Sequence, residues 1–76
     1  MSAKEMFEAL NFYKLETSHY VHGITYIKTL DKEYEEVSFF EDDGRILIPI
    51  KNINILDDEL IKAINQQCKE LGWLDE

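Results

Sequence analysis

The chain is poor in cysteine, proline and glycine, and these shortages exclude several kinds of site. Its 76 residues include one cysteine, one proline and three glycines. A single cysteine cannot form a disulfide within the chain, which is typical of proteins of the reducing cytoplasm. The three glycines, Gly23, Gly44 and Gly72, are isolated from one another, so the sequence holds no glycine-rich loop of the kind that binds phosphate groups.

Basic residues and long apolar runs are also scarce. Eight Lys and Arg stand against sixteen Asp and Glu, a formal net charge of −8. Direct binding to nucleic acid is not expected, because it depends on clusters of basic side chains. No apolar run approaches the roughly eighteen residues of a membrane span, and the N-terminus lacks the basic and then apolar pattern of a signal peptide. The sequence therefore predicts a cytoplasmic protein that does not bind membranes.

Hydrophobic residues are plentiful, at 45% of the chain, and aromatic residues reach 12%, which argues against disorder. The length allows one small domain, which we expect to comprise residues 1–76. The core of such a domain is thin and supports few buried polar groups. Because the sequence also lacks any enzyme motif, we expect neither catalysis nor a cofactor.

A helix is expected near each end of the chain. Ser2 and Glu5 have the spacing of a capping box before residues 3–10, and Asn11 is a plausible left-handed terminator. Asp57 is expected to cap a second helix that Gly72 ends. The apolar stripes of the two helices consist of Ala3, Met6, Phe7 and Leu10, and of Leu60, Ile61, Ile64, Cys68 and Leu71.

Between the helices the pattern has the period of two that is typical of strands. We expect a weak edge strand within residues 12–17 and better strands over 24–30, 33–40 and 45–50. Two-residue turns at Asp31-Lys32 and Asp43-Gly44 would join the last three strands. The first turn places Tyr26 opposite Val37, and the second places Asp42 opposite Arg45 and Phe39 opposite Ile48.

Both registers assign the same residues to the core face of the sheet. Those residues are Ile24, Tyr26, Val37, Phe39, Ile46, Ile48 and Ile50. Pro49 has no amide hydrogen to donate, so the last strand is expected at an edge. The predicted fold is α+β: a single antiparallel sheet of three to four strands in a meander, with the N- and C-terminal helices packed on one face, in the order α-β-β-β-β-α.

His19, His22 and Cys68 are the only combination in the sequence with any likeness to a metal site or to a cysteine nucleophile with its base. Zinc needs three or four such ligands in a tetrahedral array. The preferred interpretation is two exposed loop histidines and a core cysteine, because Cys68 falls on the apolar stripe of its helix. No metal ligand and no catalytic residue are therefore assigned.

The acidic residues are concentrated in one segment. Residues 31–43 contain seven acidic residues and one lysine, a net charge of −6. Such a surface can bind a basic groove on a protein, including one that binds nucleic acid. The candidate partner-binding residues are Glu33, Glu35, Glu36, Glu41, Asp42 and Asp43. The alternative is a solvated surface that only keeps the protein soluble.

The outer face of the sheet is the second candidate surface. If both helices cover the Val37 side, the apolar residues on the other side would be exposed together, and such patches often mark an interface. These residues are Ile27, Tyr34, Phe40 and Leu47. A different protein or a second copy of the chain could bind there. Alternatively, the N-terminal helix or the first strand covers part of this face.

Two segments in the predicted helices resemble small uncharacterised proteins encoded by prophages and mobile elements of Gram-positive bacteria. They are Ala3-Lys4-Glu5-Met6-Phe7-Glu8-Ala9-Leu10 and the residues Glu59-Leu60, Ala63-Ile64-Asn65-Gln66-Gln67 and Glu70-Leu71-Gly72-Trp73, about a third of the chain. The resemblance brings no catalytic residues. It implies a bacterial host cell and an inhibitor of host nucleases or defence complexes, such as an anti-CRISPR protein.

Three functions follow as hypotheses. The preferred one is an acidic protein that binds and inhibits a host or defence protein that handles nucleic acid, in the manner of anti-CRISPR or anti-restriction proteins. The alternative is a structural or assembly protein, or a homodimeric interaction module without inhibitory activity. An enzyme based on His19, His22 and Cys68 is the third and is not expected.

Overall fold

The computed structural model describes residues 1–18, 20–48 and 57–74. Its four strands form one antiparallel sheet in the order β1-β2-β3-β4, so each strand pairs with its neighbour in the chain. This confirms the predicted α+β class and the meander. The elements in chain order are α1 (Ala3–Ala9), β1 (Tyr13–Lys14), β2 (Gly23–Thr29), β3 (Tyr34–Phe40), β4 (Arg45–Leu47) and α2 (Asp58–Glu70).

The predicted capping box begins α1. The Glu5 amide donates to Ser2 Oγ over 3.1 Å, and the Ser2 amide donates to Glu5 Oε1 over 2.9 Å. The hydrogen bond from the Ser2 amide stabilises the ionised carboxylate, and it lowers the pKa of Glu5. Asn11 follows the helix with a φ of 70°, which confirms the predicted left-handed terminator.

The predicted caps of α2 are confirmed at both ends. Asp57 Oδ1 accepts the Leu60 amide over 2.8 Å. At the other end Gly72 has a φ of 78°, and the Trp73 amide donates to the Cys68 carbonyl over 2.9 Å. This is the Schellman arrangement that a glycine at this position favours. Ile61 departs from the predicted apolar stripe, because it is 45% exposed.

The first hairpin has the predicted register. Tyr26 lies opposite Val37 and Lys28 opposite Glu35. The Leu30 amide donates to the Glu33 carbonyl over 2.7 Å, which closes a turn of two residues. Local turn chemistry was therefore enough to determine the pairing of β2 with β3.

The predicted register of the second hairpin is wrong by two residues. Phe39 lies opposite Ile46, not Ile48, and Phe40 lies opposite Arg45. Residues 41–44 form a longer loop, which the Gly44 amide closes by donating to the Phe40 carbonyl over 2.9 Å. Gly44 has a φ of 65°, so its left-handed conformation serves a four-residue loop instead of a two-residue turn. A shift of two keeps every side chain on its predicted face, and residues 49 and 50 lie outside the described residues.

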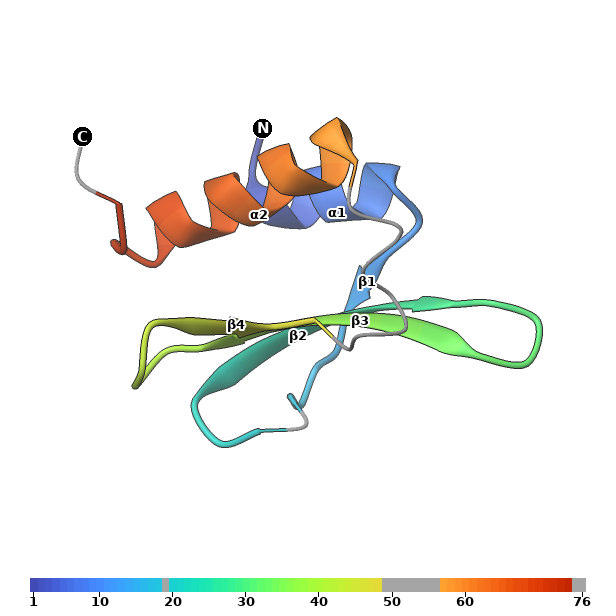
Figure 1. The fold of residues 1–76 in the computed structure, drawn as a ribbon, viewed down its shortest axis with the longest axis horizontal. Coiled ribbons are helices and arrows are strands. Elements are labelled where there is room, and N and C mark those ends of the chain that lie inside the picture. The colour runs from blue at the N-terminus through green and yellow to red at the C-terminus, as the bar shows by residue number, and fades with distance from the viewer. Residues whose placement is uncertain (19, 49–56, 75–76) are drawn as a thin grey trace.

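Both helices lie on one side of the sheet (Figure 1), where aromatic rings pack around Phe7 of α1. The Phe7 ring of α1 stacks on the Tyr26 ring at 3.9 Å between centroids and 11° between planes. It also meets the Phe12 and Phe39 rings edge to face at 5.7 and 6.2 Å. From α2, Gln67 Oε1 accepts the Tyr26 hydroxyl over 2.6 Å. The core cluster contains Phe7, Phe12, Tyr26, Val37, Phe39, Leu60, Ala63 and Cys68.

Residues 15–18 and 20–22, between β1 and β2, lie on the other side of the sheet (Figure 1). We call residues 15–18 and 20–22 the strap. The Leu15 amide donates to the Thr25 carbonyl over 3.0 Å, and Ser18 Oγ lies 2.8 Å from Thr25 Oγ1. The ring centroids of Tyr20 and Phe40 are 4.8 Å apart. The two sides of the sheet therefore have different covers: helices on one side and the strap on the other.

Candidate protein-binding site

Two of the six acidic residues predicted to contact a partner are buried. Glu35 is 7% exposed and Glu36 is 5% exposed. Glu35 shares the core side of β3 with Val37 and lies opposite Lys28 on β2. Glu36 points to the strap side, where its Oε2 accepts the Ser38 hydroxyl over 2.6 Å. The predicted acidic surface is therefore wrong along the body of β3.

Glu36 belongs to a chain of hydrogen-bonded side chains that sequence reasoning missed. Ser38 Oγ lies 2.9 Å from Thr25 Oγ1, which lies 2.8 Å from Ser18 Oγ of the strap. Thr25 and Ser38 have no exposed surface. Hydrogen bonds offset the cost of burying these polar groups. The signal in the sequence is one small hydroxyl residue on each strand, Thr25 on β2 and Ser38 on β3, which the register places opposite each other.

The apolar outer-face residues also do not share one exposed patch. Ile27 is only 7% exposed, and its backbone lies opposite Tyr13 of β1. Phe40 is half-buried and contacts the Tyr20 ring. Tyr34 and Leu47 are 45% and 37% exposed. The expectation of a common exposed face is therefore wrong, because the strap lies against this side and β1 extends the sheet beside Ile27.

The remaining predicted acidic residues divide between two turns. Glu33 is exposed in the turn that joins β2 to β3, together with Asp31. Glu41, Asp42 and Asp43 are exposed in the loop that joins β3 to β4. Figure 1 shows these two connections at opposite ends of the sheet. The acidic segment thus forms two charged ends, separated by a strand whose own two acidic residues are buried.

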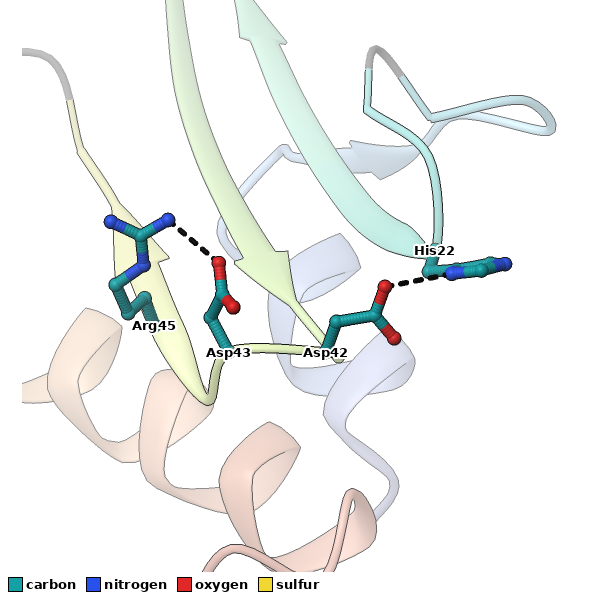
Figure 2. Close-up of polar contacts among 4 residues, drawn as sticks. All are labelled: His22, Asp42, Asp43 and Arg45. Atoms are coloured by element: carbon teal, nitrogen blue, oxygen red, sulfur yellow. Dashed lines mark hydrogen bonds and ion pairs between the residues drawn. The ribbon is translucent and has the colours of Figure 1, made fainter.

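The loop of residues 41–44 holds the richer set of polar contacts (Figure 2). His22 Nδ1 lies 2.8 Å from Asp42 Oδ2, and Arg45 Nη2 donates to Asp43 Oδ2 over 2.7 Å. The hydrogen bond to Asp42 raises the pKa of His22, and the negative charges of Asp42 and Glu41 add to this effect. All four side chains remain at least half exposed to solvent.

Apolar surface adjoins this charged loop. Val21, next to His22 in the strap, is 83% exposed. The Arg45 guanidinium lies over the Phe40 ring at 5.6 Å, in the geometry of a cation–π contact. Aromatic and arginine side chains beside an exposed aliphatic residue are typical of protein interfaces. We call residues 20–22 and 40–45 the loop surface.

The structure does not bring the candidate metal residues together. Cys68 belongs to the core cluster on the helix side, whereas His22 is exposed in the strap, just before β2. Burial raises the pKa of the Cys68 thiol, which lowers its reactivity. Among the described residues no three His, Cys, Asp or Glu side chains are grouped so as to hold a metal ion. His19 lies outside the described residues.

Neither helix in the described part of the chain is long and apolar enough to cross a membrane. Comparisons with protein-family models, with curated protein sequences and with solved structures found no match.

Proposed function

We propose that the protein binds a basic surface on a protein that handles nucleic acid, and that it inhibits this partner by competing with the nucleic acid. The observation that carries the proposal is the loop surface, where three exposed acidic residues lie beside the exposed Val21. Opposite charge attracts a basic groove from a distance, and a central apolar contact adds affinity at short range.

The loop surface is also well held before any partner arrives. The Glu41 amide donates to the His22 carbonyl over 3.0 Å, and the Gly44 amide donates to the Phe40 carbonyl over 2.9 Å. Both bonds tie the loop of residues 41–44, which we call the acidic loop, to the paired ends of β2 and β3. A binding loop that is ordered in the free protein loses less conformational entropy on association. This favours a role in binding.

The test uses three double substitutions that change the net charge equally but at different places. Glu41→Lys with Asp43→Lys alters the loop surface, and Asp31→Lys with Glu33→Lys alters the opposite turn. Glu8→Lys with Glu59→Lys alters exposed positions on the two helices and is the control. The assay is displacement of a fluorescent DNA duplex from purified CRISPR and restriction nucleases.

We expect the loop-surface pair to weaken displacement by about tenfold or more, and the helix pair to change it less than about threefold. Added salt should also weaken the binding of the wild-type protein to the nuclease, because it screens exposed charges. Thermal unfolding of each variant separates a loss of binding from a loss of fold. Equal weakening by all three pairs would refute a local site, and no displacement from any nuclease would refute inhibition by this route.

A homodimeric module is the second candidate function, and β4 is the observation that favours it. Within the described residues β4 pairs with β3 alone, and its Ile46 and Leu47 are 39% and 37% exposed. An edge strand with exposed apolar residues can pair with a second copy. Sedimentation at high concentration checks this candidate: a Leu47→Lys variant should remain monomeric if the wild-type protein is a dimer.

A further inference from the structure

His22 connects the strap to the acidic loop through two different groups. Its carbonyl accepts the Glu41 amide over 3.0 Å, and its Nδ1 lies 2.8 Å from Asp42 Oδ2. Its φ of 54° is left-handed, a conformation that non-glycine residues adopt uncommonly. This backbone bend places the end of the strap beside the loop of residues 41–44 (Figure 2).

We propose that His22 and Asp42 form a proton-operated latch that holds the end of the strap to the acidic loop. The protonated imidazolium donates a charge-assisted hydrogen bond to the carboxylate, which is stronger than the bond from the neutral ring. Protonation therefore tightens the latch and removes one negative charge from the loop surface. The latch goes beyond the proposed function and does not depend on it.

The charged groups around the ring favour protonation. Asp42 and Glu41 face His22 from the acidic loop, and Glu16 of the strap borders the same open hollow of about 430 Å³ as His22. Arg45, at the start of β4, forms an ion pair with Asp43 of the acidic loop. Because the pKa of His22 is raised in the folded protein, the added strength that protonation gives the latch is fully present below pH about 6.5 and is lost as the pH rises through the raised value.

Two variants separate the latch from the general charge of the loop. Asp42→Asn removes the partner of His22, whereas Asp43→Asn removes an equal charge from the same loop and leaves Asp42 in place. NMR follows the ring protons of His22 from about pH 5 to about pH 9 in both variants and in the wild-type protein. A His22→Gln variant distinguishes its signals from those of His19.

We expect Asp42→Asn to lower the pKa of His22 clearly and Asp43→Asn to leave it nearly unchanged. At about pH 5.5, Asp42→Asn should also speed hydrogen exchange of the Glu41 amide by about twofold to fivefold, the range for exposed ion pairs. The effect should shrink at about pH 8.5, and the Leu30 amide at the other end of the sheet is the internal control. An unchanged His22 titration in Asp42→Asn would overturn the latch, as would equal effects of the two substitutions.

Discussion

The two sides of the sheet are covered by different chemistry. On the helix side, aromatic rings of α1, β2 and β3 stack and meet edge to face around Phe7. On the strap side, a chain of hydroxyl groups leads from Ser18 through Thr25 and Ser38 to the carboxylate of Glu36. Both covers exclude water from the sheet, since Val37 and Ser38, which point to opposite sides, have no exposed surface.

The difference shows which kind of change each side can tolerate. Apolar packing loses stability in proportion to the volume and surface removed. A buried polar chain loses stability when one member is removed, because its neighbours keep their desolvation cost without a partner. The helix side should therefore dominate the stability of the fold, while the strap side should respond sharply to substitutions that change few atoms.

The largest expected effect is that of Phe7→Ala on the helix side. Phe7 is fully buried and contacts three other rings, so its loss should cost about 3–5 kcal/mol. That is comparable to the whole stability of a domain of this size, about 5 kcal/mol. Urea unfolding followed by circular dichroism should show a largely unfolded variant at 25 °C. The control is Phe40→Ala on the strap side, where the ring is only half-buried and about 1–2 kcal/mol should be lost.

Alkaline pH tests the same aromatic layer without changing its packing. Burial raises the pKa of Tyr26 to about 12, with the charges of Glu70 and Glu8 adding to it. Because the folded pKa lies above the usual value near 10, the stability that the protonated Tyr26 hydroxyl contributes is fully present below about pH 10 and is lost as the pH approaches about 12. We expect a loss of about 2–3 kcal/mol over this interval.

Tyr26→Phe is the matched variant for the alkaline experiment. It removes the titrating hydroxyl, so the alkaline loss of stability should become smaller. It also leaves the buried Gln67 Oε1 without its hydrogen bond from the Tyr26 hydroxyl, which should lower the free energy of unfolding by about 1–2 kcal/mol at neutral pH. Urea midpoints that fall equally with pH in both proteins would show that Tyr26 does not carry the alkaline transition.

Sequence reasoning succeeded where the signal was local. The caps of α1 and α2 are set by side chains within a few residues of the helix ends, and the first hairpin is set by its own two-residue turn. The predicted register of the second hairpin is wrong because the dipeptide Asp43-Gly44 suits both a two-residue turn and a four-residue loop. Both loops are equally local, and the pairing of Phe40 with Arg45 in the structure shows that Gly44 closes the four-residue one.

The candidate site was harder to predict because burial there depends on a distant segment. Glu36 and Ile27 alternate with core residues, a pattern that predicts exposure to solvent, but the strap lies against that side and β1 extends the sheet beside Ile27. The period of two predicts a strand within residues 12–17, but only Tyr13–Lys14 form β1. The hydroxyl contact between Ser18 and Thr25, which holds the strap to the sheet, has no short-range signal in the sequence. The exposure of the acidic turn residues agrees with the prediction, because other segments seldom pack over turn residues.

A middle-sized effect is expected from Ser38→Ala on the strap side. Ser38 Oγ donates to Glu36 and also lies within hydrogen-bonding distance of Thr25. The substitution removes a single oxygen atom, but it takes a hydrogen-bond donor away from a buried carboxylate, which should lower the free energy of unfolding by about 2 kcal/mol. Thr29→Val is the control, because Thr29 is an exposed residue at the end of β2 and its change should stay within about 0.5 kcal/mol. Similar urea midpoints for the two variants would show that the hydroxyl chain contributes little.

The smallest effect is expected from Gly23→Ala, which tests how closely the strap approaches the sheet. A Cβ atom at residue 23 would lie 3.0 Å from Ser18 Oγ and 3.2 Å from the Tyr20 carbonyl oxygen. The strap must move outward by a few tenths of an ångström, which should cost about 1 kcal/mol because it lies at the surface. Ser18→Ala in the same chain removes the closest of these contacts, so the double variant should lose less stability than the two single losses combined. Additive losses would mean that Ser18 and residue 23 do not compete for space, and that the strap is held mainly by the Tyr20 ring and its backbone bonds.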